Sequence, residues 1–278
     1  MREATMRNHF WFHLLLAGTL VGCGQGSGEL GQSQQGISTH RRFVFVHGAW
    51  QGGWVWDGVA QRLREDGETV SQVTLPAHDG DSLAPNAATL DAYLQRVSEV
   101  VHDGGSLPVH LVGHSLGGLV ISQYAEQDPT AVQDLIYVAG LLPQNGQSVL
   151  DMVSLDPYSQ LGANMVVDFG TMTADLPLSA LGPVLCADCS ANQLAPLRTR
   201  HHVEPLIPAL TPVRLGDNFA SVPKKYLFTL DDQTISYPAQ QYMASSVPMV
   251  RTATVRTAHQ PMLSAPGRLT GALQELAR

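Results

Sequence analysis

Basic side chains are scarce in this 278-residue sequence, which holds 16 lysines and arginines against 24 aspartates and glutamates. The net charge of -8 and the lack of any basic run argue against a nucleic-acid partner, because such surfaces concentrate lysine and arginine. The sequence also lacks an internal repeat and the cysteine–histidine spacing of zinc sites, so we expect no metal ion. With 44% apolar and only 14% charged residues, it is typical of one large globular domain or a domain with an insertion.

The apolar run at residues 10–21 is too short to span a membrane as a helix. Two arginines precede it, as in signal peptides, and it ends in the sequence LVGC at Cys23, which resembles the bacterial lipobox. We expect residues 1–23 to be a signal peptide with a lipidated Cys23, and residues 24–40 to be a flexible tether. The protein would then be exported and anchored in a bacterial cell envelope. The alternative is an ordinary signal peptide with an incidental cysteine, and a secreted protein.

Cysteine is rare, with only 3 in the chain. Export places Cys186 and Cys189 in an oxidising compartment, where they could close a small disulfide loop. Redox chemistry at a C-x-x-C motif needs a thioredoxin-like context, which the surrounding sequence does not supply. We therefore expect either a structural disulfide or two buried thiols.

Apolar segments of strand type alternate with segments of helical type over residues 41–140 and again over residues 222–278. The expected strands are 42–46, 70–75, 109–112, 135–138, 226–230 and 250–255. The expected helices are 54–65, 89–101, 116–125, 238–245 and 266–276. Strands that alternate with helices imply right-handed crossovers, so we expect an α/β fold with a mostly parallel, doubly wound sheet covered on both faces.

Residues 141–221 interrupt this alternation, since they are rich in proline, methionine and leucine and show poor periodicity. We expect them to form an inserted, largely helical cap over the sheet. Apolar cap side chains that could line a substrate pocket are Met152, Tyr158, Leu161, Met165, Phe169, Met172 and Leu185. For most of them the alternative is that they simply pack the cap onto the core.

The sequence GHSLG at residues 113–117 has the G-x-S-x-G pattern of a nucleophile elbow, a sharp turn from strand to helix. Its two glycines allow the strand and the helix to approach closely, and they place Ser115 in a strained conformation with an exposed hydroxyl. Unpaired N–H groups at the start of the helix favour developing negative charge. We therefore predict Ser115 as a catalytic nucleophile.

A serine nucleophile needs a base that removes its proton and an acid that orients the base. In this architecture both follow the serine in the chain, at the carboxyl ends of later strands. His259 comes directly after the last expected strand and is the predicted base. Asp231 and Asp232 both follow the strand at 226–230, and their position alone does not decide which is the acid.

The charged oxygen of an acyl-transfer intermediate needs two backbone N–H donors. Leu116, which follows the serine, supplies one, and the loop after the first strand supplies the other, with Ala49 preferred and Trp50 as the substitute. The residues expected to contact substrate are Trp50, His114, Tyr158, Met165 and Phe169. Within the elbow, the His114 side chain is expected to point away from the reacting atoms.

Two stretches resemble the α/β-hydrolases of the plant methylesterase and hydroxynitrile lyase branch, which has bacterial pyrethroid-hydrolase-like relatives. They are FVFVHGAW at residues 43–50, followed by GGWVW, and LVGHSLGG at residues 111–118. Residues 221–243 fit the acid-bearing strand and helix of that branch, and their register places the catalytic acid on Asp232. The similarity runs from about residue 42 to the end and is weak in the cap. It implies an α/β-hydrolase fold and ester hydrolysis without a cofactor.

The lyases of this branch differ from the chain at two positions. The resemblance implies a threonine after the first-strand histidine and a lysine after the catalytic histidine, where this chain has Gly48 and Gln260. Without the lysine no charge holds a leaving cyanide, so ester hydrolysis is favoured over cyanohydrin cleavage. We expect a serine carboxylic-ester hydrolase acting on a small to medium, mainly apolar ester. The alternatives are a lyase and a non-catalytic ligand-binding protein with a vestigial triad.

Overall fold

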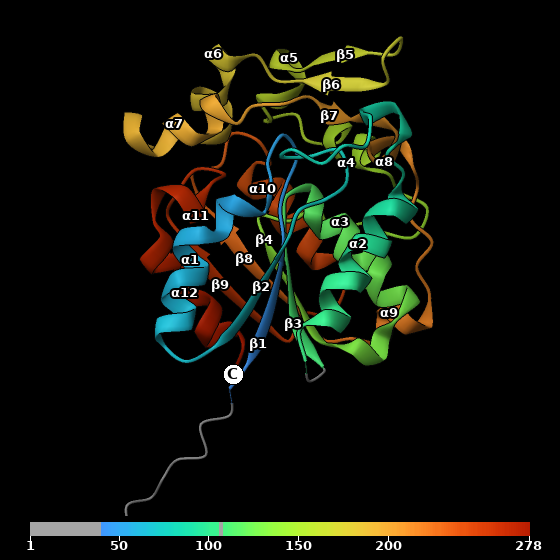
Figure 1. Ribbon diagram of the computed structural model, residues 1–278, viewed down its shortest axis with the longest axis vertical. Coiled ribbons are helices and arrows are strands. Elements are labelled where there is room, and N and C mark those ends of the chain that lie inside the picture. The colour runs from blue at the N-terminus through green and yellow to red at the C-terminus, as the bar shows by residue number, and fades with distance from the viewer. Residues whose placement is uncertain (1–39, 106–107) are drawn as a thin grey trace, which may run out of the picture. The chain divides into compact units, whose positions relative to one another are not determined.

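The core of the protein is a six-stranded parallel sheet (Figure 1). The computed structural model describes residues 40–105 and 108–278. The strands of the sheet have the order β2-β1-β3-β4-β8-β9, with bounds β1 Arg42–Val46, β2 Thr69–Val73, β3 Val109–His114, β4 Val132–Val138, β8 Lys224–Thr229 and β9 Arg251–Val255. The predicted signal peptide, lipobox and most of the tether fall on residues 1–39, outside the described residues. No helix of the described part is long and apolar enough to cross a membrane.

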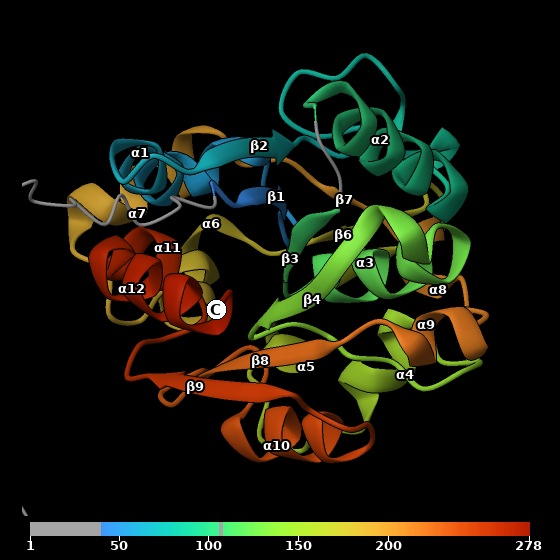
Figure 2. The same ribbon diagram turned by 90° about the horizontal axis from the view of Figure 1, so that it is seen from below.

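Helices cover both faces of this sheet (Figure 2). On β1, Phe43 and Phe45 belong to the apolar cluster that contains residues of α1 and α12. The alternate residues Val44 and Val46 belong to the cluster on the opposite face, which contains residues of α2, α3 and α10. The bounds of these helices are α1 Asp57–Glu65, α12 Pro266–Leu276, α2 Leu90–Asp103, α3 Leu116–Gln127 and α10 Tyr237–Ser245. Shorter helices connect them: η1 Gly53–Trp56, η2 Pro85–Ala87, η3 Pro129–Ala131 and α11 Pro261–Ser264. The expected α/β fold with a mostly parallel, doubly wound sheet is confirmed.

The order of the strands explains why the candidate catalytic side chains lie together at one edge of the sheet. β2 lies on one side of β1 and β3 on the other, so the direction of winding reverses between β1 and β3. At such a point the loops that leave the carboxyl ends of the strands diverge and form a crevice. The loops after β1 and β3 carry Ala49 and Ser115, and those after β8 and β9 bring Asp232 and His259 to the same edge.

The insertion after β4 lies over this carboxyl edge (Figure 1). It consists mainly of short helices, as predicted, and also contains a small antiparallel sheet of order β5-β6-β7, which was not predicted. Strands of two or three residues are too short for an alternating pattern to be recognised in the sequence. The elements are α4 Val149–Ser154, α5 Leu161–Asn164, β5 Val166–Asp168, β6 Thr173–Asp175, α6 Leu178–Ala180, η4 Leu181–Leu185, α7 Ala191–Thr199, β7 Glu204–Pro205, α8 Leu206–Leu210 and α9 Asp217–Ser221. The last of these, α9, packs beside α3 and therefore belongs to the core.

β4 begins at Val132 and not at residue 135 as predicted, which is the clearest shift in a strand boundary. A buried cluster of charged side chains explains this difference. Asp134 interrupts the apolar pattern of the strand, yet it is buried in the sheet. Its carboxylate accepts a hydrogen bond from Lys225 Nζ at 2.8 Å and lies 2.9 Å from His110 Nδ1. The three side chains satisfy one another where water cannot reach them.

Replacing Asp134 by alanine is expected to lower the free energy of unfolding by about 3–5 kcal/mol, because Lys225 would remain as a buried, unpaired charge. The matched control is Asp231→Ala, which breaks an exposed ion pair with Arg256 and should cost less than about 1 kcal/mol. Urea denaturation followed by circular dichroism measures both. Equal losses in the two variants would contradict the importance assigned to the buried cluster.

Candidate active site

Ser115 occupies the sharp turn between β3 and α3, with φ of 52° and ψ of -123°. A non-glycine residue at positive φ is strained, and such strain persists only where the surroundings enforce it. Here the enforcing contacts come from the flanking glycines. A Cβ atom on Gly113 would lie 2.6 Å from the carbonyl oxygen of Gly117, and one on Gly117 would lie 2.7 Å from the carbonyl oxygen of Val46. The turn is therefore possible only with glycine at both positions.

Asp232 and His259 form a buried pair at the same edge of the sheet. His259 Nδ1 and Asp232 Oδ2 are 2.8 Å apart, and both side chains are almost fully inaccessible to solvent. The other carboxylate oxygen accepts the backbone N–H groups of Thr234 and Ile235, at 2.8 and 2.9 Å. These donors fix the carboxylate in the orientation that the imidazole needs.

Asp231, the neighbouring candidate for the acid, lies at the surface. Its side chain is 49% exposed and pairs with Arg256 at 2.8 Å. The two adjacent aspartates therefore point in different directions, and only Asp232 contacts His259. Position in the sequence alone could not make this distinction.

His114 connects the elbow to His259. The centroids of the two imidazole rings are 4.6 Å apart, and His114 Nε2 donates to the backbone carbonyl of His259 at 2.8 Å. Burial, followed by the nearby charge of His259, holds the pKa of His114 well below its usual range, so the ring is neutral. In the described residues no hydrogen bond joins Ser115 Oγ to His259; in resting hydrolases this contact is often long and tightens when substrate binds.

The loop after β1, residues 47–50, passes directly against the elbow. Because it carries the predicted oxyanion donor, we call it the oxyanion loop. A Cβ atom on Gly48 would lie 2.9 Å from Ser115 Cβ and 2.8 Å from His114 Nδ1, so the close approach requires glycine. The N–H of Trp50 is occupied, because it donates to the Glu204 carboxylate at 2.8 Å. Of the two candidate donors in this loop, Ala49 is thus the one with a backbone N–H left for a ligand.

A cavity opens beside Ser115 and is lined mainly by apolar side chains. Of the predicted substrate-binding residues, it includes Trp50 and Met165. The cavity is lined by Ala49, Trp50, Ser115, Leu116, Leu141, Val149, Leu150, Val153, Leu161, Met165, Ala174, Glu204, Leu206, Ala209, Thr234 and Ile235. Among these described residues, Glu204 alone has an ionisable side chain.

Three residues expected in the substrate pocket lie elsewhere. Tyr158 lines a neighbouring cavity between α4 and α10, and Phe169 is 69% exposed in the turn after β5. The side chain of His114 is buried against His259 and does not line the cavity. The cap sequence has no periodicity from which inward-facing and outward-facing positions could have been separated.

Sequence reasoning also missed Glu204 and His78, which contact each other at 2.8 Å near the oxyanion loop. Both are buried, although they follow segments that resemble ordinary surface loops. The only signal in the sequence was an isolated carboxylate directly before the Pro-Leu-Ile segment at residues 205–207. That signal is weak, because single acidic residues are usually exposed.

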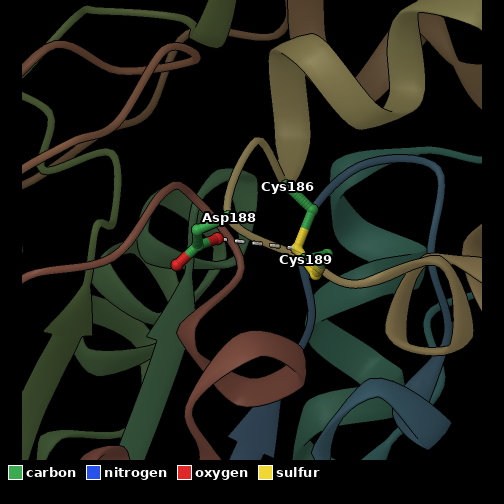
Figure 3. Close-up of side chains that lie close together, drawn as sticks. All are labelled: Cys186, Asp188 and Cys189. Carbon is green, nitrogen blue, oxygen red and sulfur yellow. Dashed lines mark hydrogen bonds between the residues drawn. A yellow bond between two sulfur atoms is a disulfide. The ribbon is translucent and has the colours of Figure 1, made fainter.

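Cys186 and Cys189 are joined by a disulfide in the loop between η4 and α7, and Asp188 lies beside them (Figure 3). This matches the structural bridge that was one of the two expectations for the pair. The three side chains are close enough to resemble a metal site, but disulfide sulfurs offer no thiolate ligand. We therefore assign this cluster no metal.

Curated relatives of the chain include esterases and hydrolases. The chain is 31% identical over 251 residues to "Putative methylesterase 11, chloroplastic" of Arabidopsis thaliana, which covers 85% of this chain and 64% of the relative. It is 29% identical over 146 residues to a carbendazim hydrolyzing esterase of Nocardioides, over 51% of this chain and 59% of the relative. It is 26% identical to a pyrethroid hydrolase of Sphingobium wenxiniae, over 84% and 86% of the two chains. The chain thus spans less than two thirds of the first two relatives.

Solved structures agree on the fold. A pyrethroid hydrolase from Sphingobium faniae superimposes with a TM-score of 0.75 at 23% identity, over 86% of this chain and 98% of the other. A methylesterase from Arabidopsis gives a TM-score of 0.75 at 18% identity, over 85% and 98%. The sequence model of the alpha/beta hydrolase family matches residues 43–272, which include the elbow and the Asp232–His259 pair. The chain belongs to the alpha/beta hydrolase family.

Proposed function

We propose that the protein is a serine carboxylic-ester hydrolase, with Ser115 as nucleophile, His259 as general base and Asp232 as the acid that orients it. The observation that carries this proposal is the buried Asp232–His259 pair, held beside a strained serine elbow at the carboxyl edge of the sheet. The esterases and hydrolases among the curated relatives support ester hydrolysis as the reaction class.

In the first half of the proposed reaction, His259 removes the hydroxyl proton of Ser115 as the serine oxygen attacks the ester carbonyl. The carbonyl π-electrons move to oxygen, and the N–H groups of Ala49 and Leu116 stabilise the resulting oxyanion. His259 then gives its proton to the leaving alcohol as the carbon–oxygen bond breaks. Throughout this step Asp232 stabilises the imidazolium without taking up its proton.

In the second half, His259 removes a proton from water, and the water oxygen attacks the acyl-enzyme. The same N–H groups hold the second oxyanion, and Ser115 leaves with the proton from His259. The carboxylic acid is released and the enzyme returns to its first state. Neither half requires a metal or an organic cofactor, because every proton and electron pair moves between substrate, water and side chains of the chain.

The proposed substrate is a small to medium, mainly apolar ester. The apolar lining of the cavity at Ser115 supports this class, because a charged substrate would lose its hydration there. The ionisable residue in the described lining, Glu204, is already paired with His78. Gly48 and Gln260 argue against the lyase alternative. A side chain at position 48 would collide with Ser115 and His114, and the buried Gln260 carries no charge that could hold cyanide.

Ser115→Ala is expected to lower kcat for p-nitrophenyl esters by at least about 10⁴-fold, because it removes the attacking oxygen. A fluorophosphonate probe should label the wild type and leave this variant unlabelled. An unchanged unfolding midpoint shows that the fold is intact. If the wild type neither reacts with the probe nor hydrolyses esters, the protein is a ligand-binding protein or a lyase, and cleavage of mandelonitrile separates these two.

Asp232→Asn is expected to lower kcat by about 10⁴-fold, because the amide no longer stabilises the imidazolium or its correct tautomer. Asp231→Asn is the matched control, since this neighbouring carboxylate pairs with Arg256 at the surface and should leave kcat unchanged. Steady-state kinetics of the two variants with one ester make the comparison. Comparable losses in both variants would contradict the assignment of Asp232 as the acid.

We also propose that Cys23 is lipidated and that the enzyme is anchored in the cell envelope by its N-terminus. Cys23→Ser should abolish the incorporation of labelled palmitate and move the protein from the membrane fraction to the soluble fraction, because stable anchoring depends on the acyl chains. Ester hydrolysis by the released protein should be unchanged. Palmitate labelling that persists in Cys23→Ser would overturn the proposal.

A further inference from the structure

Glu204 is a charged residue in the cavity at Ser115 to which the proposed reaction assigns no role. It belongs to β7 of the cap, and its side chain is only 3% exposed. A buried carboxylate is unfavourable unless it is paired and hydrogen-bonded, so its contacts indicate what it does. An unpaired negative charge here would also oppose the oxyanion that must form nearby.

The charge of Glu204 is balanced by His78. Glu204 Oε2 lies 2.8 Å from His78 Nε2, while His78 Nδ1 lies 2.9 Å from the carbonyl oxygen of Pro76. A neutral imidazole has only one N–H, so it cannot donate to both acceptors, whereas an imidazolium can. Burial by itself lowers the pKa of His78, but the charge and hydrogen bond of Glu204 outweigh it, and this pKa is raised. The Tyr93 hydroxyl, 3.4 Å from Glu204 Oε1, completes the surroundings of the carboxylate.

Glu204 also fixes one of two successive peptide groups in the oxyanion loop. Leu75 N–H donates to His47 Nε2 at 3.0 Å, so the His47 proton is on Nδ1 and is donated to the carbonyl oxygen of Gly48 at 2.8 Å. The N–H of Ala49 belongs to that same trans peptide and therefore points away from His47. The next peptide contains the N–H of Trp50, which donates to Glu204 Oε2 at 2.8 Å.

Trp50 has a strained backbone conformation, which persists only if other contacts hold it in place. Its φ is 60°, in the left-handed region that a bulky residue rarely adopts. The cap holds Trp50 at two points, because its indole Nε1 donates to the carbonyl oxygen of Ala174 at 3.0 Å while its backbone N–H donates to Glu204. Ala174 of β6 and Glu204 of β7 are directly paired in the small antiparallel sheet. The two acceptors therefore belong to one hydrogen-bonded pair of strands.

We propose that Glu204 is a positioning residue that fixes the oxyanion loop, so that the β6–β7 pair of the cap holds the Ala49 N–H in place for catalysis. Glu204 accepts the N–H of Trp50 and thereby sets the peptide that follows Ala49, while His47 sets the peptide that precedes it. His78 keeps the carboxylate neutralised, so that the oxyanion forms beside a balanced charge. This inference rests on the proposed ester hydrolysis.

The test compares two substitutions of Glu204 that differ in what they retain. Glu204→Met has similar length but no acceptor for the Trp50 N–H, and it should lower kcat by about 100-fold, close to the loss of one oxyanion donor. Its KM should change little, because the bound ester carries no oxyanion before the serine attacks. Glu204→Gln keeps an amide oxygen that accepts the Trp50 N–H, and it should retain kcat to within about 5-fold, since only the charge is lost.

Two further measurements separate positioning from a general loss of structure. The affinity for a trifluoromethyl ketone, which forms an oxyanion on Ser115, should fall by the same factor as kcat in Glu204→Met. Arg200→Gln is the matched control, because it breaks another bond between cap and core, to Asp79 at 2.8 Å, and should leave both quantities unchanged. Should Glu204→Met fail to fold, Glu204→Asp retains the buried charge next to His78 but is one methylene shorter, and it should show the same loss of kcat.

Hydrogen exchange of the Trp50 amide, followed by NMR, tests the contact without reference to catalysis. This amide should exchange faster in Glu204→Met than in the wild type, Glu204→Gln or Arg200→Gln. Wild-type kcat in Glu204→Met or Glu204→Asp, or equal losses in Glu204→Met and Glu204→Gln, would overturn the positioning role. If the wild type shows no ester turnover that depends on Ser115, the proposed function fails, whereas unchanged exchange of the Trp50 amide in Glu204→Met refutes the contact itself.

Discussion

The site depends on the close approach of three backbone segments at the carboxyl edge of the sheet. The loop after β1, the end of β3 and the first turn of α3 meet with no room for a Cβ atom at Gly48, Gly113 or Gly117. Because these backbones touch, Ser115 is held at a positive φ and the N–H groups of Ala49 and Leu116 come to the same side of the sheet. The glycines thus determine where the proposed oxyanion would be stabilised.

The sheet itself makes the distant partners converge. In a parallel sheet every strand ends at the same edge, so residues that follow β3, β8 and β9 meet although they lie far apart in the chain. For this reason the fold, the elbow and the neighbourhood of His259 could be predicted from apolar segments and a single motif. The choice between Asp231 and Asp232 could not be made from their positions in the sequence. It depends on the local turn, in which the N–H groups of Thr234 and Ile235 donate to the carboxylate of Asp232.

The sequence showed that the cap interrupts the alternation of strands and helices, but it did not reveal the elements of which the cap consists. Its strands contain two or three residues, and its apolar side chains divide between the cavity, the neighbouring hollow and the surface without a periodic pattern. Glu204 was missed for a related reason, since a carboxylate is recognised as buried only once its partners are known. These partners come from the loop after β1, the loop after β2, and α2. Long-range hydrogen bonds of this kind leave no local trace in a sequence.

The pairing of Ala174 with Glu204 ties the cap, which lines the cavity at Ser115, to the loop that carries the proposed oxyanion donor. An exchange of this insertion for that of a relative would alter the residues that line the cavity. Such an exchange would also replace the acceptors that hold Trp50, so under the proposed mechanism substrate range and turnover would change together. A chimera that is meant to alter selectivity alone must therefore keep these two short strands from the parent enzyme.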